Sequence, residues 1–66
     1  MRDESRILPF MERLAKQWQS NCPDWRFGQL LINFLSWYGR DPFYLEEKEF
    51  EERFNDFIKE TFGDEN

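Results

Sequence analysis

The chain has 66 residues, of which 20% are aromatic, with one cysteine, no histidine and a formal net charge of −5. Without histidine it lacks the usual general base near neutral pH and every histidine-containing triad or metal site, so we predict no enzyme, no cofactor and no metal ion. The length allows one domain, over residues 1–66, and the aromatic content exceeds that of a disordered acidic segment.

The acidic side chains gather in the last third of the chain. Residues 1–45 carry six basic and five acidic residues, whereas residues 46–66 carry three basic and nine acidic ones. Such a surface repels phosphate backbones, so direct nucleic-acid binding is disfavoured. No stretch approaches the roughly 20 apolar residues of a membrane helix, and the N-terminus lacks a signal-peptide pattern. A single cysteine cannot form an intramolecular disulfide, and we expect a cytoplasmic protein.

A first helix is predicted over residues 5–20. Asp3 or Ser5 can cap its start, and Pro9 fits near its first turn, where a missing N–H costs little. Apolar residues recur at spacings of three and four and should form its buried face. They are Ile7, Phe10, Met11, Leu14, Ala15 and Trp18.

A second helix is predicted over residues 25–38, and its apolar circumference indicates the buried centre of the fold. Asp24 is expected to cap its start, and Gly39 to end it. Gly28, in its first turn, indicates the close approach of another backbone; a tolerated surface glycine is the alternative.

A third helix is predicted over residues 46–62. The residues expected on its buried face are Phe50, Phe54, Phe57, Ile58 and Thr61. The intervening loop, residues 40–45, is expected to be extended. Its apolar residues Phe43, Tyr44 and Leu45 should fold back over the helix ends and close the core. The fold class predicted is therefore all-α, a compact three-helix domain.

Three aromatic residues lie off the main helical stripes or in the loop. Trp25, Trp37 and Tyr44 can anchor an interface with another protein, a second copy of the chain included, since exposed Trp and Tyr often do so. The alternative is that a small core needs bulky residues from several directions. Cys22 also has two interpretations: a nucleophile activated by a helix N-terminus, or a small thiol packed against the core.

The acidic residues of the third helix are candidates for contacting a basic protein. Pairs at i,i+4 could in principle bind Mg²⁺ or Ca²⁺, but one exposed helix supplies converging oxygen ligands poorly. A solvated acidic face is the simpler interpretation. The candidate partner-binding residues on this helix are Glu47, Glu51, Glu52 and Asp56.

The stretch PDWRFGQLLIN (23–33), followed by DPFYLE (41–46), resembles a group of short, uncharacterised bacterial and phage proteins with a PDxRxGQLxxN stretch, a DPFY stretch and an acidic helix. The resemblance implies a small helical domain and no activity. It also suggests a structural clamp, in which Arg26, Gln29 and Asn33 share a polar face. In this clamp Arg26 pairs with Asp41 or bonds to loop carbonyls there, and Asn33 bonds to the backbone of residues 41–45.

The sequence favours a non-enzymatic intracellular module that binds a protein partner and has a regulatory role. The alternative is a phage-encoded acidic inhibitor that mimics nucleic acid and occupies the basic groove of a host nuclease or another nucleic-acid enzyme, in the host cytoplasm. Salt-sensitive binding would distinguish it. Its phosphate-mimicking residues would be Glu46, Glu47, Glu51, Glu52 and Asp56.

Overall fold

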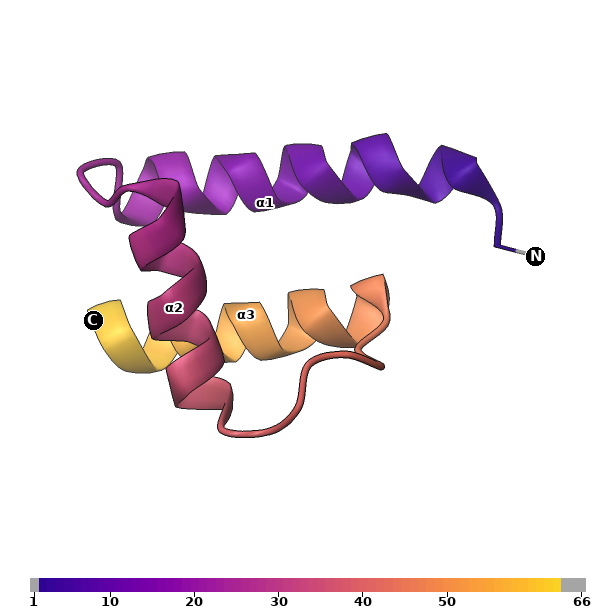
Figure 1. Cartoon of the computed structure of the whole chain (residues 1–66). Coiled ribbons are helices and arrows are strands. Elements are labelled where there is room, and N and C mark those ends of the chain that lie inside the picture. Colours follow the sequence, from indigo (N-terminus) through magenta and orange to yellow (C-terminus); the bar gives the residue numbers. More distant parts are fainter. Residues whose placement is uncertain (1, 64–66) are drawn as a thin grey trace.

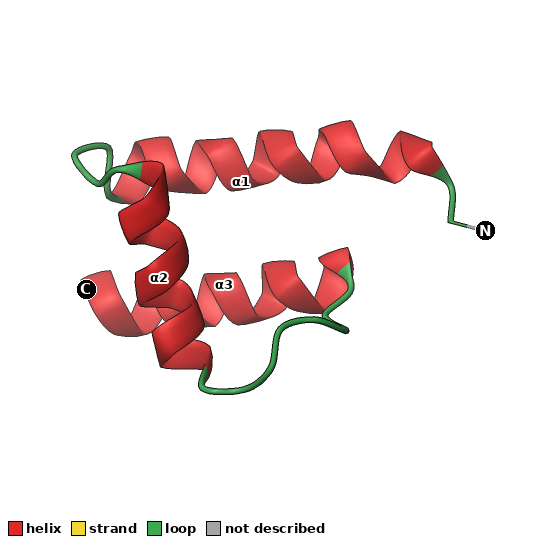
Figure 2. Cartoon of the chain, viewed as in Figure 1, coloured by secondary structure: helices red, strands yellow, loops and turns green. Residues whose placement is uncertain are grey.

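The structure, a computed structural model, describes residues 2–63. A 3-10 turn, η1 (Glu4–Arg6), leads into α1 (Ile7–Asn21), and α2 (Phe27–Tyr38) and α3 (Glu47–Phe62) follow (Figure 1). Loops alone join these helices in Figure 2. The predicted all-α, three-helix fold is confirmed, with helix boundaries within two residues of those expected. Among the described residues, no helix combines the length and apolarity needed to cross a bilayer.

α1 and α3 lie side by side and run in the same direction, as Figure 1 shows. The contacts between them keep a nearly constant offset along the sequence: Arg6 bonds to Glu47, 41 positions away, and Gln17 to Asn55, 38 positions away. A parallel pair needs a connection that returns the chain to its starting end. α2 and the loop after it make that connection, with α2 crossing at a steep angle.

The core lies where α2 crosses α3. Phe34 of α2 is fully buried, and its ring centroid lies 4.8 Å from that of Phe50 and 5.3 Å from that of Phe54. A buried aromatic side chain removes about 150–250 Å² from water, so an aromatic cluster gives a short chain a large buried apolar area. The buried residues of this core are Cys22, Leu30, Phe34, Phe54, Phe57 and Ile58.

The expectation that α2 is the buried centre is wrong, because α3 is the helix that packs against both others. α1 and α2 meet near the loop that joins them, residues 22–26, where the ring centroids of Trp18 and Phe27 lie 5.5 Å apart. Phe50 of α3 packs against both, with its ring centroid 5.6 Å from that of Phe10 in α1 and 4.8 Å from that of Phe34 in α2. Ile32 of α2 is 64% exposed, on the side of that helix that faces away from the core formed by the described residues.

The helix ends follow the predicted signals in part. Asp3 caps η1 by accepting a hydrogen bond from Ser5 N at 3.0 Å, and Gly39, at φ 71°, ends α2, so both expectations are confirmed. Asp24 is not the cap of α2, which starts beyond Arg26 with no side-chain cap. The reason is a turn in which Trp25 N donates to the Cys22 carbonyl at 3.0 Å and holds this segment outside the helix.

Gly28 marks no close backbone approach, and that expectation is wrong. A Cβ atom built on Gly28 would meet nothing within 4 Å beyond its own helix. The residue is exposed on the first turn of α2, so the alternative of a tolerated surface glycine describes it.

Candidate protein-binding surface

The loop before α3 forms a tight turn that presents two aromatic rings to solvent; we call residues 41–45 the aromatic turn. The Asp41 carboxylate accepts a hydrogen bond from Phe43 N, and Leu45 N donates to the Pro42 carbonyl, both at 3.0 Å. Phe43 and Tyr44 at the tip are 78% and 82% exposed.

The expectation that this segment folds back over the core is therefore wrong. The two hydrogen bonds tighten the chain at residues 42–45 and point the tip outward, so only Leu45 is half-buried. The rings of Phe43 and Tyr44 pack edge to face, with centroids 4.8 Å apart and planes at 83°. Each ring restricts the other, so the aromatic turn offers a pre-organised apolar surface.

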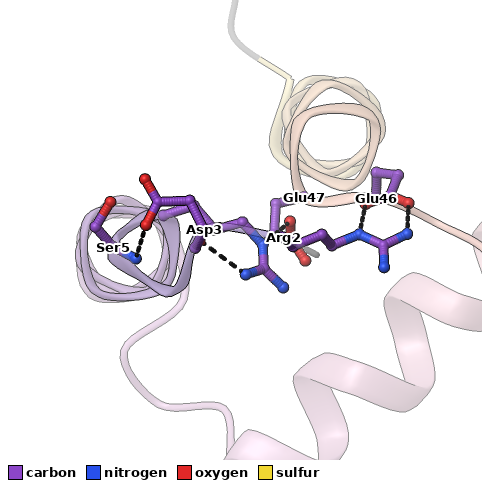
Figure 3. A network of polar contacts seen from close by, with 6 residues as sticks. Arg2, Asp3, Ser5, Glu46 and Glu47 are labelled. Carbon is purple, nitrogen blue, oxygen red and sulfur yellow. Dashed lines mark hydrogen bonds and ion pairs between the residues drawn. The ribbon is translucent and has the colours of Figure 1, made fainter.

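A pocket of about 440 Å³ lies beside the aromatic turn, between the start of α1 and the start of α3. Two ion pairs border it: Arg2 with Glu46, and Arg6 with Glu47 at 2.8 Å. Figure 3 shows Arg2 turned toward Glu46, with both guanidinium contacts drawn. Hydrogen bonding to these arginines lowers the pKa of both Glu46 and Glu47. The four charges balance, so the pocket carries no net charge.

These ion pairs belong to a longer row of polar contacts between α1 and α3, which we call the polar seam. It continues with Arg13 bonded to Glu51 at 2.6 Å and Gln17 bonded to Asn55 at 2.8 Å. Hydrogen bonding to Glu51 raises the pKa of Arg13. The seam fixes the register of two helices that share few buried side chains.

Most of the acidic residues predicted to contact a partner are therefore held in ion pairs within the chain. Glu46, Glu47 and Glu51 pair with arginines of the N-terminal segment, and Asp56 pairs with Arg53 at 3.2 Å. Of the five residues predicted to mimic phosphates, only Glu52 has no ion-pair partner among residues 2–63.

Trp25 and Trp37 are half-buried parts of the core rather than free anchors. The ring of Trp25 lies 5.5 Å from that of Phe62, and the ring of Trp37 lies 5.8 Å from that of Phe57. The Trp37 indole also donates to Glu60 at 2.9 Å. Of the three aromatic residues predicted to contact a partner, Tyr44 alone is largely exposed.

The predicted clamp does not form among the described residues. Arg26 lies before α2 and Asp41 beyond its end, and twelve helical residues separate the two ends by about 18 Å. The Asp41 carboxylate instead bonds to Phe43 N. Arg26 and Gln29 are exposed, and no hydrogen bond joins Asn33 to the loop within residues 2–63.

Cys22 is 4% exposed at the end of α1, and burial raises the pKa of its thiol. This position fits the packed thiol and contradicts the activated nucleophile, which needs a lowered pKa and access. Within the part of the chain that the structure describes, no three His, Cys, Asp or Glu side chains gather as metal ligands would.

Sequence reasoning missed two exposed residues, Phe43 and Leu8. Phe43 was expected in the core but is exposed. The Asp-Pro pair before it, which favours a tight turn, was the feature of the sequence that could have indicated this exposure. Leu8 is 74% exposed beside the predicted face of α1, where Ile7 and Met11 are also more than 40% exposed.

Comparisons with protein-family profiles, with curated proteins and with solved structures found no match.

Proposed function

We propose that this chain is a non-enzymatic protein-binding module that engages its partner through the aromatic turn. The observation that carries the proposal is the exposure of Phe43 and Tyr44, 78% and 82%, on a turn closed by two hydrogen bonds. Aromatic anchors dominate the energy of many protein interfaces, and a pre-ordered turn loses little entropy on binding. The pocket beside the turn offers a concave site for a partner side chain.

The charges around this surface support a contact anchored by apolar groups. Arg2, Arg6, Glu46 and Glu47 already satisfy one another, so they give a partner no net charge to meet. Binding should therefore depend weakly on salt. A reducing cytoplasm is the compartment in this proposal, because the single cysteine is buried and forms no intramolecular disulfide.

The acidic inhibitor has less support. A mimic of nucleic acid needs unpaired carboxylates in a row, and the ion pairs with Arg2, Arg6, Arg13 and Arg53 occupy most of those predicted for that role.

The test is capture of partners from a lysate of the source organism, with a photo-crosslinking residue placed in every form at the exposed position 40, just before the aromatic turn. The Phe43→Ala/Tyr44→Ala variant is compared with the otherwise unchanged chain and with Ile32→Ala, which removes an exposed apolar side chain elsewhere. We expect wild type and Ile32→Ala to capture the same partner at low and high salt, and the double variant to lose it. Equal capture by the double variant, or a partner lost in high salt from every form, would contradict the proposal.

A further inference from the structure

One face of α1 has no partner in the monomer. None of the fifteen residues of α1, all within the described part, is fully buried, although the helix is strongly amphipathic. α2 lies against α1 only near the loop that joins the two helices, and the N-terminal turns of α1 extend beyond α2 (Figure 1). The apolar face predicted from the sequence is thus covered in part. Leu14 and Trp18 pack on the core and Phe10 packs on Phe50, whereas Ile7 and Met11 stay exposed.

Residues bordering the uncovered side of α1 follow a heptad spacing. Leu8, Met11 and Ala15 are exposed and separated by three and then four positions, and the half-buried Trp18 continues the row. This spacing is the pattern by which two helices pack along a seam. Leu8 is 74% exposed, the highest exposed fraction among the large apolar residues of α1.

The same face carries a hollow that fits such a projection. A mostly apolar pocket of about 240 Å³ is lined by Ala15, Trp18, Gln19 and Pro23. Residues at i, i+3 and i+4 are the positions that form a hole for a side chain of a facing helix. Leu8 and this pocket lie about two and a half turns apart on one face of α1.

We propose that α1 forms an antiparallel, two-fold symmetric helix pair with a second copy of this chain. In such a pair Leu8 of each copy enters the pocket of the other, and Met11 packs near Ala15 at the centre. A projection and a hollow on the same face are self-complementary, which is what a closed two-fold interface requires. The contact is distinct from the aromatic turn and does not rest on the function proposed for it.

A second copy suits this face for two further reasons. A chain of this length gains stability from disulfides, metals or association, and the described residues offer neither a disulfide nor a metal cluster. Glu12 and Lys16 border this exposed face of α1 with opposite charges, so two antiparallel copies bring no net charge together at the proposed contact. The polar seam to α3 lies on another side of α1 and stays intact in the pair.

Sedimentation velocity over a concentration series tests the proposal. We expect wild type and the control Ile32→Glu to approach twice the monomer mass of 8.3 kDa, and Leu8→Glu and Ala15→Phe to halve that mass. Leu8 is exposed, so circular dichroism should show the same helicity for Leu8→Glu and wild type. A wild type that stays monomeric up to about 1 mM, or a Leu8→Glu variant that still dimerises, would overturn the proposal and leave the face to a different protein.

Disulfide trapping tests the direction of the pair. Positions 8 and 19 are about 16 Å apart within one α1, too far for an internal disulfide. We expect the Leu8→Cys/Gln19→Cys variant to form a covalent dimer on mild oxidation, and each single variant to remain uncrosslinked because equivalent positions lie apart in an antiparallel pair. A covalent dimer formed by the single variant Leu8→Cys, through a disulfide between the two copies of position 8, would overturn the antiparallel arrangement. So would a double variant that forms no disulfide between position 8 of one copy and position 19 of the other.

Discussion

Arg6 of η1 donates from Nε to Oε1 of Glu47 at 2.8 Å, across 41 positions of sequence. The contact joins the N-terminal segment to the first turn of α3, and it lies beside the aromatic turn. One residue earlier, Glu46 pairs with Arg2 in the same way. The acidic start of α3 therefore has a structural use, which is to hold the N-terminal segment parallel to α3.

These ion pairs should make the protein sensitive to acid. Hydrogen bonding to arginine lowers the pKa of Glu46 and Glu47 in the folded chain, so the unfolded chain takes up these protons first. Their contribution is complete above the ordinary glutamate pKa of about 4.3 and is lost as pH falls through the lowered folded values. We expect the Tm from circular dichroism to fall across this window.

The control for the acid response is Glu46→Gln/Glu47→Gln, which keeps the shape of both side chains and removes their titration. Its Tm should be lower than that of wild type at pH 7 and should fall less on acidification. Identical acid profiles for the two proteins would show that other carboxylates carry the response.

Gly28→Ala should stabilise the domain. The added methyl group meets nothing within 4 Å beyond the helix itself, and alanine favours the helix over glycine by about 0.5–1 kcal/mol. We expect a Tm higher by several degrees. Gly39→Ala is the matched control and should lower the Tm, because Gly39 has a φ of 71° that alanine adopts at a cost. A fall for Gly28→Ala would mean that Gly28 has a contact absent from this structure.

Phe34→Ala should unfold the domain or nearly so. Phe34 of α2 is 0% exposed, and its ring packs against α3. Replacing a buried phenylalanine by alanine lowers the free energy of unfolding by about 3–5 kcal/mol. That loss is comparable to the whole stability of a small domain. Phe34→Leu should melt at an intermediate temperature, and Ile32→Ala, on the exposed side of the same helix, should change the free energy of unfolding by less than about 0.5 kcal/mol. Equal losses at positions 32 and 34 would contradict the assigned faces of α2.

Cys22 should react slowly with a thiol reagent in the native protein. The residue is 4% exposed, and burial raises the pKa of its thiol, so both access and thiolate content are low. Absorbance after addition of an aromatic disulfide should rise slowly in buffer and rapidly in denaturant. Native reactivity equal to that of the denatured chain would place Cys22 at the surface.

The helices could be predicted because their signals are local. Periodic apolar residues and the Gly39 stop act within a few positions, and the boundaries agree within two residues. The hub of the fold could not be predicted this way, because it depends on how α2 crosses its neighbours. α2 meets α1 only near Trp18, so Ile7 and Met11 in the first half of the apolar face of α1 are left exposed. Phe10, in the same half, packs on Phe50 of α3.

The candidate surface was predicted in part, through Tyr44. Its neighbour Phe43 was assigned to the core because an apolar run looks the same whether a turn points it inward or outward. The ion pairs of Glu46, Glu47 and Glu51 were missed because their arginine partners lie 38 to 44 positions away, and no local spacing identifies such pairs. Only the pair of Asp56 with Arg53, three positions away, is local. The clamp failed for a simpler reason, since a helix of twelve residues holds its ends apart.

The most direct test of the account is calorimetric titration of a captured partner with wild type, Phe43→Ala and Tyr44→Ala at two salt concentrations. Each ring should matter at a partner interface while contributing little to the fold, because both are largely exposed. We predict that each substitution raises the Kd by about tenfold or more at both salt concentrations, with Tm values equal to that of wild type. Unchanged Kd values for both variants would contradict the central claim that the aromatic turn anchors the partner.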